Sequence, residues 1–291
     1  MPELSPALDR HQPENEPGSV ASRTMLRCRR ACAVGVALVA LALLPSGPAY
    51  AASPGDLLDA LVSAYSDKLA GHDAERIYWR DGTAMPVSDG IAFKSYEQML
   101  TNSSILDQLS LRYPRGALGQ PPGVNEDPGR FRNEPFFLKM YGDCRKGEVE
   151  QQLVPIAWLP HSWGRTVRVT RINGVAERLQ AVAGEIDALP DAIRRAAYPI
   201  SGVLSCRPVR DTGRLSMHAF AAAIDLNIAV SDYWLWQQSS AAGAIRYRNR
   251  MPPEIVDIFE RYGFIWGGKW YHYDTMHFEY RPELLAVTGR P

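Results

Sequence analysis

The chain has no excess of charge and few of the patterns that identify a protein class at a glance. Its 32 Lys and Arg residues balance 32 Asp and Glu residues, which argues against a protein held to nucleic acid by bulk charge. Internal repeats, low-complexity segments and the helical zinc motif HExxH are absent from the sequence. The longest apolar run, residues 31–44, is short for a membrane span of roughly 20 residues. With 46% apolar and 22% charged residues, the composition is that of a globular chain, not a disordered one.

The first 51 residues differ from the rest of the chain. A polar, Pro-containing stretch is followed by four arginines between residues 23 and 30 and then by the apolar run. Pro45 and Pro48 end that run, and Ala49-Tyr50-Ala51 forms a small-x-small site. This order predicts a secretory signal peptide with a preceding disordered extension, cleaved after Ala51. We therefore expect an exported protein, periplasmic or extracellular, with no stable membrane span after cleavage; a membrane anchor is the alternative.

Cleavage would leave Cys144 and Cys206 as the cysteines of the mature chain. Two cysteines in an exported protein permit one intramolecular disulfide. Two buried free thiols are the alternative, and we favour the disulfide.

Periodicity after residue 51 predicts an α+β fold with a small antiparallel sheet and flanking helices. Apolar stripes predict helices over 54–69 and 175–189, and Pro252-Pro253 predicts the start of another that Gly263 ends. Residues 113–135, rich in Pro and Gly, predict a long loop over the surface. Strand-like segments are the following: 76–79, 166–172, 201–206, 222–228 and 276–280.

Two C-terminal segments concentrate the residues that can carry metal chemistry. The first is Ser216-Met217-His218 with Asp225 seven residues after the histidine, and the second is the run 273–279, YDTMHFE. A catalytic zinc site needs about three N or O ligands, an open position and a carboxylate to accept a proton from water. The pattern can supply the ligands from His218, Asp225 and His277, with Asp274 as the carboxylate.

These motifs resemble those of the VanY-like D-alanyl-D-alanine carboxypeptidases and the related L-alanyl-D-glutamate endopeptidases. The likeness rests on Ser-x-His with Asp seven residues later, on Trp266-Gly-Gly-x-Trp270, and on Asp274-x-x-His-Phe-Glu279. It covers roughly residues 198–284. The resemblance implies a zinc peptidase that cuts peptidoglycan stem peptides, with its zinc site in a cleft on the sheet. Residues 198–291 would form the catalytic core, on which the unassigned residues 52–197 are expected to pack.

Carried over residue by residue, the resemblance implies one Zn²⁺ per chain, held by His218, Asp225 and His277, with Asp274 as general base. The segment from Ser201 through Arg207 resembles the strand that supplies an arginine to the substrate and the oxyanion. Arg207 is our first candidate for that arginine, with Arg210 and Arg214 as rivals. Ser216 corresponds to a substrate-positioning residue. One departure is Ala221, where the family usually has Gly; a methyl group there would matter if the backbone has positive φ.

Four residues keep more than one interpretation. Of the two tryptophans, Trp266 is expected in the core and Trp270 in the cleft, where it would bind substrate. His272 either lines the cleft, replaces Asp274 or lies on the surface. Glu279 either pairs across its strand or orients His277.

The sequence thus predicts an exported zinc metallopeptidase with a peptidoglycan stem peptide as substrate. Alternatives are a catalytically silent zinc protein that binds the cell wall, a structural envelope protein, and a peptidase of other small peptides.

Overall fold

The structure is a computed structural model that describes residues 52–209, 212–237 and 245–286. The predicted signal peptide and its extension lie outside these residues. The described helices are α1 (Pro54–Ala64), α2 (Tyr96–Thr101), α3 (Ile105–Gln108), α4 (Glu134–Tyr141), α5 (Val175–Asp187), α6 (Asp191–Arg194), α7 (Pro253–Arg261) and α8 (Pro282–Ala286). The described strands are β1 (Leu69–His72), β2 (Arg76–Trp79), β3 (Ala84–Pro86), β4 (Leu153–Trp158), β5 (Arg165–Thr170), β6 (Ala223–Asp225), β7 (Phe264–Trp266) and β8 (His277–Tyr280).

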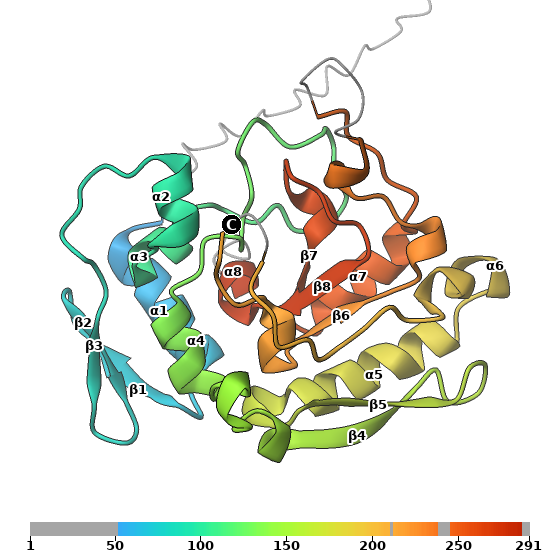
Figure 1. The fold of residues 1–291 in the computed structure, drawn as a ribbon, viewed down its shortest axis with the longest axis horizontal. Helices are drawn as coiled ribbons and strands as arrows, with labels where there is room; N and C mark the ends of the chain where they lie inside the picture. The colour runs from blue at the N-terminus through green and yellow to red at the C-terminus, as the bar shows by residue number, and fades with distance from the viewer. Residues whose placement is uncertain (1–51, 210–211, 238–244, 287–291) are drawn as a thin grey trace, which may run out of the picture. The chain divides into compact units, whose positions relative to one another are not determined.

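In the described part of the chain the strands form three small antiparallel sheets, with orders β1-β2-β3, β4-β5 and β6-β8-β7 (Figure 1). Helices α5 and α7 pack against strands of the second and third sheets and against each other. The mixture of helices and small antiparallel sheets confirms the predicted α+β architecture. None of the described helices is long and apolar enough to cross a membrane.

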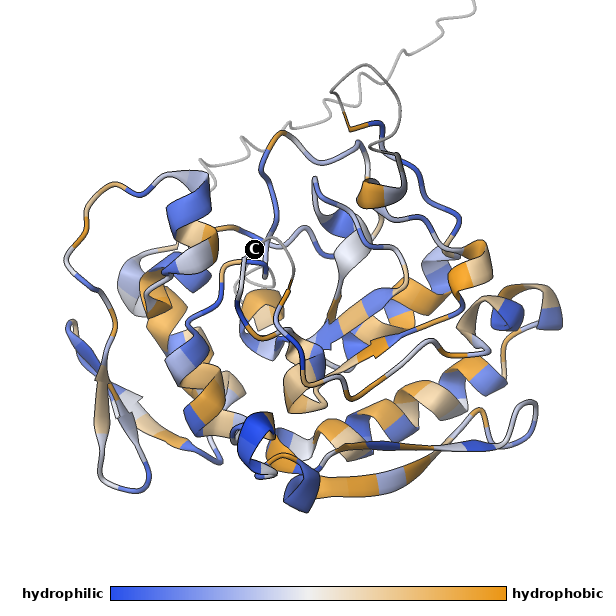
Figure 2. Cartoon of the chain, viewed as in Figure 1, coloured by the Kyte–Doolittle hydropathy of each residue, from blue (hydrophilic) through white to orange (hydrophobic). Residues whose placement is uncertain are grey.

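Local sequence explains the two helices α1 and α5. Ser53 caps α1 through a capping box with Asp56, and Leu58 and Leu61 are buried. The helix ends at Ala64, earlier than predicted, so Leu69 instead begins β1. In α5, apolar residues at steps of three and four face the β4–β5 hairpin, and Figure 2 shows this stripe along the helix.

The predicted strand 201–206 is wrong. Its backbone pairs with β6 only where Ser201 N donates to Asp225 O and Asp225 N donates to Gly202 O. Further along, Ser205 N donates to His218 O. This part of the segment therefore lies against the turn that carries His218 and forms no β-ladder. The other predicted strands are present, some shorter than expected: β6 spans only three residues of the predicted 222–228.

The predicted loop 113–135 has no helix or strand until α4, but its later half is not on the surface. Residues 127–132 are buried. At its start, Tyr113 Oη donates to Glu260 Oε1 over 2.6 Å, and Lys269 Nζ donates to Pro114 O over 2.6 Å. Lys269 and Glu260 also form a buried ion pair at 2.5 Å. The loop is therefore fixed against α7 and the segment that follows β7.

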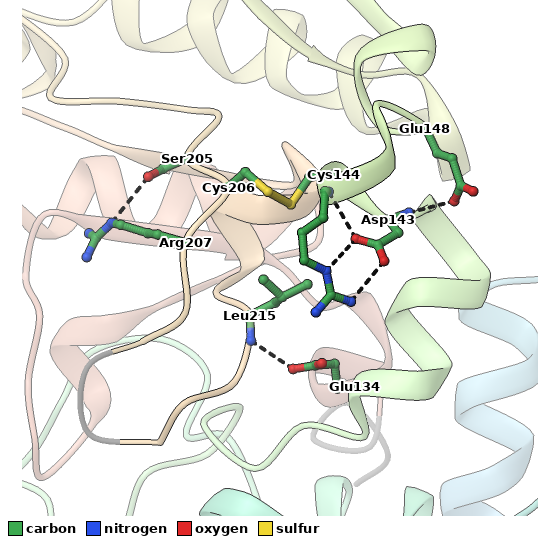
Figure 3. The surroundings of a disulfide bond; sticks show 9 residues. Glu134, Asp143, Cys144, Glu148, Ser205, Cys206, Arg207 and Leu215 are labelled. Carbon is green, nitrogen blue, oxygen red and sulfur yellow. Dashed lines mark hydrogen bonds and ion pairs between the residues drawn. A yellow bond between two sulfur atoms is a disulfide. The ribbon is translucent and has the colours of Figure 1, made fainter.

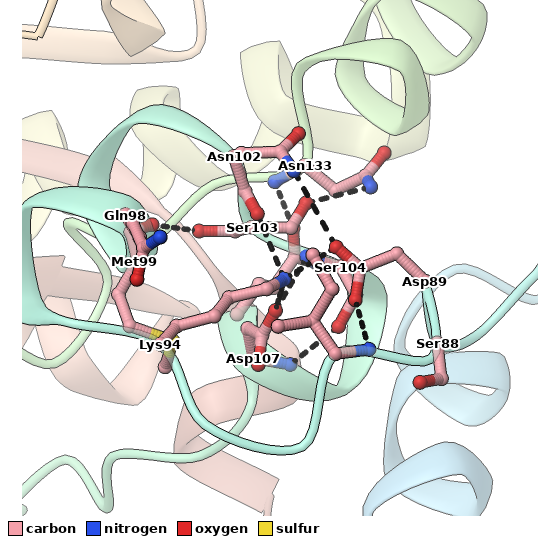
Figure 4. Close-up of polar contacts among 12 residues, drawn as sticks. Ser88, Asp89, Lys94, Gln98, Met99, Asn102, Ser103, Ser104, Asp107 and Asn133 are labelled. Atoms are coloured by element: carbon pink, nitrogen blue, oxygen red, sulfur yellow. Dashed lines mark hydrogen bonds and ion pairs between the residues drawn. The ribbon is translucent and has the colours of Figure 1, made fainter.

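A buried lysine organises the segment around α2 and α3. The Lys94 side chain is 2% exposed, and its ammonium group contacts the carboxylates of Asp89 and Asp107 (Figure 4). It also donates to Asn102 O over 2.9 Å. Asp107 in turn belongs to the capping box of α3 with Ser104. These contacts hold the two short helices together.

Residues 52–197 and 198–286 share one hydrophobic core. Helix α1 contacts α8, and the buried Tyr65 Oη donates to Glu283 Oε2 over 2.7 Å. A disulfide joins Cys144, in the η1 turn (Cys144–Lys146), to Cys206, with the Cα atoms 5.7 Å apart (Figure 3). It is the pair that the sequence favours, and it ties the segment after α4 to the segment that precedes the His218 turn.

Candidate metal centre

Three side chains, two from the C-terminal sheet and one from the turn before it, converge on one point. His218 Nε2 lies 3.0 Å from His277 Nδ1 and 3.1 Å from Asp225 Oδ1. His277 Nδ1 lies 3.0 Å from the same carboxylate oxygen. Both imidazoles are 8% exposed and the carboxylate is 22% exposed, so the group is reached from solvent mainly over Asp225. The structure therefore brings together the three residues that the sequence predicts as ligands.

Pairing between β6 and β8 places Asp225 beside His277. The two residues are direct partners in the antiparallel register, and opposing side chains on one face lie about 5 Å apart. His218 reaches the same point from the η5 turn (Met217–Phe220), which leads into β6. The spacing of seven residues is thus one short turn followed by the start of a strand.

Two features set the shape of the η5 turn. Ser216 caps it, since its Oγ accepts a hydrogen bond from His218 N over 3.1 Å. Ala221 ends it in the left-handed region, with φ 50° and ψ 31°. This is the position where the resembling family usually has Gly, and here the backbone has the positive φ that favours glycine. The structure gives Ser216 a capping role at the ligand; its predicted contact with substrate stays a prediction.

In each imidazole, the nitrogen that points away from the cluster has a hydrogen-bond partner. His218 Nδ1 lies 2.7 Å from Val203 O, which can only accept, so the proton resides on Nδ1 and Nε2 presents a lone pair. His277 Nε2 lies 2.9 Å from Glu279 Oε2, so in the neutral ring the proton resides on Nε2 and Nδ1 presents a lone pair. Second partners of this kind fix the tautomer and ring orientation of metal-binding histidines. Of the two interpretations of Glu279, the structure favours the one in which it orients His277.

Two arginines compensate the fully buried Glu279 carboxylate. Arg132 Nη1 lies 3.3 Å from Oε2, and Arg281 Nη1 lies 3.2 Å from Oε1. Gly129 makes room for this arrangement: its carbonyl accepts from Arg281 Nη1 over 2.8 Å, and its φ is +101°. A Cβ at residue 129 would lie 2.4 Å from Ile265 Cδ1. Arg132 and Gly129 come from the loop before α4, so residues outside the C-terminal motifs support the centre.

The donor set fits a zinc ion. Zn–N and Zn–O bonds of about 2.0–2.1 Å in a tetrahedron place ligand atoms about 3.3 Å apart, close to the 3.0–3.1 Å observed. Three protein ligands of N and O type, one of them partly exposed, match catalytic sites that keep a fourth position for water. The cluster can therefore hold a metal.

Electrostatics at this point favour positive charge. Burial alone would lower the pKa of His277, but hydrogen bonds to Asp225 and Glu279 raise it to about 10. Burial would likewise raise the pKa of Asp225, yet the imidazoles of His218 and His277 hold it well below its usual range. The same negative potential that would stabilise an imidazolium here stabilises a bound cation.

Asp274 lies in the turn that precedes β8, where His277 N donates to Asp274 O over 3.2 Å. Its Oδ1 is buried and has no hydrogen-bond partner among the described residues. Burial and the like charge of Asp225 raise the pKa of Asp274 to about 7, although His277, His218 and Arg130 act in the opposite direction. A carboxyl group poised in this way can exchange a proton near neutral pH.

The Trp-Gly-Gly motif packs against this turn. Asp274 N donates to Gly267 O over 3.0 Å, and a Cβ at residue 267 would lie 2.6 Å from Asp274 O. At Gly268, a Cβ would lie 2.1 Å from the Trp266 ring. Both positions thus exclude any larger residue, which explains the two adjacent glycines.

Trp270 lies in the core and does not line a cleft. It is 5% exposed, its Nε1 donates to Pro128 O over 2.7 Å, and its ring centroid lies 5.5 Å from that of His277. These contacts do not support the predicted role in substrate binding. The side chain instead supports a ligand and anchors the loop before α4. Trp266 is buried as expected, with Nε1 donating to Thr275 O over 2.9 Å.

The candidate arginines divide among different surroundings. Arg207 is exposed beside the disulfide, where its Nε donates to Ser205 Oγ over 3.2 Å (Figure 3). Arg214 donates to Thr101 O at the end of α2. Arg210 lies outside the described residues. Arg130, which no sequence motif singles out, is buried in the loop before α4, and its charge lowers the pKa of Asp274.

Comparison with known proteins supports the resemblance drawn from the motifs. Residues 210–280 match the family model described as D-alanyl-D-alanine carboxypeptidase. No curated protein and no solved structure matches the chain. The match confirms the predicted relation to the VanY-like family over this segment and indicates a peptidase acting on peptidoglycan-type peptides.

Proposed function

We propose that the chain is an exported zinc peptidase that hydrolyses peptidoglycan stem peptides, either as a D-alanyl-D-alanine carboxypeptidase or as an L-alanyl-D-glutamate endopeptidase. One observation carries the proposal. The matched segment contains His218, Asp225, Asp274 and His277, and the three ligand candidates among them converge within hydrogen-bond distance of one another. A peptidase-family match and a metal-binding geometry thus meet in the same residues.

His218 Nε2, His277 Nδ1 and Asp225 Oδ1 would hold one Zn²⁺ per chain. When bound, the ion supplies Lewis acidity, which polarises the peptide carbonyl and acidifies water. The hydrogen bonds from His218 to Val203 O and from His277 to Glu279 keep both lone pairs directed at that point.

Asp274 acts as the general base in this proposal. It accepts a proton from the water that attacks the peptide carbonyl, and a proton must then reach the leaving amine. Its raised pKa supports this role, because a carboxyl group that titrates near neutral pH can both take up and release a proton.

Arg207 remains our proposed contact to the substrate and the developing oxyanion, and Ser216 our proposed positioning residue. The exposure of Arg207 leaves its guanidinium free to approach a bound peptide. The disulfide at the adjacent Cys206 fixes the backbone that carries it.

Export to the periplasm or medium is part of the proposal, since the substrate lies outside the cytoplasm. N-terminal sequencing of protein recovered from the culture medium or periplasm is expected to begin at Ala52. Recovery of uncleaved chain in the membrane fraction would instead favour the anchor interpretation of residues 31–44.

The test of activity uses purified, zinc-loaded protein and defined muropeptides, with products identified by mass spectrometry. Loss of one terminal alanine identifies a carboxypeptidase, and cleavage next to the first alanine of the stem identifies an endopeptidase. A chelator is expected to abolish both activities, and added zinc to restore them. Zinc binding with no cleavage would contradict the proposal and favour a silent cell-wall-binding protein. Cleavage of unrelated dipeptides alone would favour a peptidase of other substrates.

A further inference from the structure

Partly exposed aromatic side chains follow one another toward the turn that precedes β8. Trp236 meets Tyr233 edge-on with ring centroids 5.8 Å apart, and Tyr233 meets Trp234 at 6.3 Å. Trp234 and Tyr271 both meet the ring of His272, at 4.6 and 4.9 Å. Trp236 is 50% exposed, and the other four residues are partly exposed. These five residues form a continuous surface, which we call the aromatic strip.

The aromatic strip ends at a pocket of about 300 Å³, to which its Tyr271 also belongs. The pocket is lined by Pro121, Pro122, Ile245, Arg246, Tyr247 and Tyr271. None of these six lining residues, all in the described part of the chain, is an acid. Pro121 and Pro122 belong to the loop before α4, outside the matched residues 210–280. One wall of the pocket is therefore built by a segment that the family model does not cover.

Hydrogen bonds and a ring contact fix the wall formed by Arg246 and Tyr247. Tyr247 Oη donates to Gly268 O over 2.9 Å, and Tyr273 Oη donates to Arg246 O over 3.0 Å. The rings of Tyr247 and Tyr273 also meet edge-on, with centroids 5.3 Å apart. The protein itself thus holds the Tyr247 ring in place, so that little side-chain freedom is lost when a ligand binds.

The pocket adjoins the turn that carries Asp274. Tyr273, which packs against the pocket wall, is the residue before Asp274 in the chain. On the other side of the turn, Gly267 O accepts from Asp274 N, and the next carbonyl, Gly268 O, accepts from Tyr247 Oη. The same short stretch thus supports the proposed general base and a wall of the pocket. A group bound in the pocket would lie beside the turn of that base.

Arg246 brings a positive charge to this pocket. It is exposed, and the described residues provide neither an ion pair nor a hydrogen bond for its guanidinium group. A guanidinium group offers five N–H donors and no acceptor. With aromatic walls and no acid among the lining residues, the pocket therefore disfavours a cation. It favours a neutral or anionic ligand that has apolar faces and oxygen atoms able to accept hydrogen bonds.

We propose that the aromatic strip and its pocket bind the glycan strand to which the stem peptide is attached, with one N-acetylated sugar ring in the pocket beside Tyr247 and Tyr271. The inference rests on the proposed function, since a peptidoglycan stem peptide is joined to such a strand. It adds a second recognition surface to the proposed substrate, next to the turn of the general base.

The chemistry of an N-acetylated sugar matches this surface. The faces of its ring carry C–H groups, which pack on the electron-rich faces of tyrosine and tryptophan. Its hydroxyl and amide oxygens accept hydrogen bonds, for which Arg246 supplies donors. A volume of about 300 Å³ lies at the lower end of ligand pockets and suits a single ring. Several rings in a row along the aromatic strip suit a polymer of such sugars.

The first experiment measures binding without catalysis. Purified, zinc-loaded protein is titrated in a calorimeter with the tetramer of N-acetylglucosamine, which carries no peptide, and a dissociation constant of about 1 mM or lower is expected. Trp236→Ala should weaken binding about fivefold or more, and Arg246→Gln about threefold or more. Both side chains are exposed, so the variants should fold. Phe93→Ala is the matched control, since Phe93 is 94% exposed but outside the aromatic strip, and it is expected to leave binding unchanged.

The second experiment compares a stem peptide that is linked to its disaccharide with the same peptide free of sugar. Trp236→Ala is expected to raise KM about fivefold more on the linked substrate than on the free peptide. An equal rise on both would overturn the proposal and show that the aromatic strip binds the peptide. No binding of the tetramer by wild-type protein at millimolar concentration would also overturn it. Binding of the tetramer without cleavage of either substrate would instead refute the proposed function and leave the glycan site in place.

Discussion

The two sides of His277 present a carboxyl group each, in opposite surroundings. Glu279, two residues after His277, lies among Arg132, Arg281 and the His277 ring. Burial would raise its pKa, but these partners lower it to about 2. Asp274, three residues before His277, is half-buried, yet its buried Oδ1 has no partner among the described residues and its pKa is raised to about 7. His277 thus has a permanently charged carboxylate on one side and, on the other, a carboxyl group that can hold a proton.

This difference separates orientation from chemistry. A carboxylate that stays charged through its arginine partners can fix the tautomer of His277 but cannot exchange a proton during a reaction. A carboxyl group with a pKa near neutral can exchange a proton during a reaction. The burial that raises its pKa does not stabilise the folded protein. The comparison predicts that the two acids respond in opposite ways to neutral replacement.

Asp274→Asn is expected to give the largest effect, on rate alone. Loss of a general base costs roughly 10²–10⁴ in kcat, or about 3–5 kcal/mol of barrier. Zinc content should be unchanged, because all three ligands remain, and the free energy of unfolding should be unchanged or higher, because an uncompensated buried acid is removed. Kinetics, metal analysis and thermal unfolding of one preparation measure all three.

Asp225→Asn is the control for that result, since it weakens a ligand and should lower zinc occupancy together with activity. Activity of Asp274→Asn within tenfold of wild type would contradict the assignment of the base.

Glu279→Gln should instead affect stability and metal affinity. Without the carboxylate, Arg132 and Arg281 lose a buried counter-charge, which costs about 3 kcal/mol of unfolding free energy. Loss of the group that orients His277 should weaken zinc binding about 10- to 100-fold. Chemical denaturation and competition with a zinc chelator measure the two effects.

Glu260→Gln provides the matched comparison, because Glu260 is equally buried and paired with Lys269 but lies outside the cluster. It is expected to lower stability by a similar amount and leave zinc affinity unchanged. An equal loss of zinc affinity in both variants would show that Glu279 acts through the fold and not through His277.

The contrast between these acids also shows what the sequence can predict. His218, Asp225, Asp274 and His277 fall in two short segments whose spacing follows from one turn and one strand pair, so local pattern was enough. The support for Glu279 comes from Arg132, 147 residues away along the chain, in a loop without periodicity. No local pattern encodes such a contact.

The wrong predictions also concern contacts with residues that are distant in the sequence. The strand expected at 201–206 has apolar residues of the right kind, but its backbone partners are the His218 turn and a single bridge to β6. The cleft position predicted for Trp270 rests on the turn expected at its glycine neighbours. Its burial depends on Pro128, which the loop brings there from far away.

Tyr65→Phe tests the far end of the buried hydrogen-bond chain that runs from Glu279 through Arg281 and Glu283 to Tyr65. Arg281 Nε donates to Glu283 Oε1 over 2.6 Å, and Tyr65 Oη donates to Glu283 Oε2 over 2.7 Å. Removing this buried donor leaves part of a carboxylate unsatisfied, which costs about 1–2 kcal/mol. Zinc affinity should be unchanged, since two residues separate Tyr65 from Glu279. Tyr78→Phe is the exposed counterpart, bonded to Asp73, and is expected to cost less than about 0.5 kcal/mol.

The smallest expected effect concerns the turn that delivers His218 to this centre. Ala221 has φ 50°, a conformation that costs an alanine about 1 kcal/mol, whereas its neighbour Ala222 is equally buried without positive φ. Both Gly variants lose one buried methyl group and gain freedom in the unfolded chain. Ala221→Gly should therefore be about 1 kcal/mol more stable than Ala222→Gly in denaturant unfolding. Equal stabilities would mean that the left-handed turn at Ala221 carries no strain, and that the residue is as well suited to it as glycine.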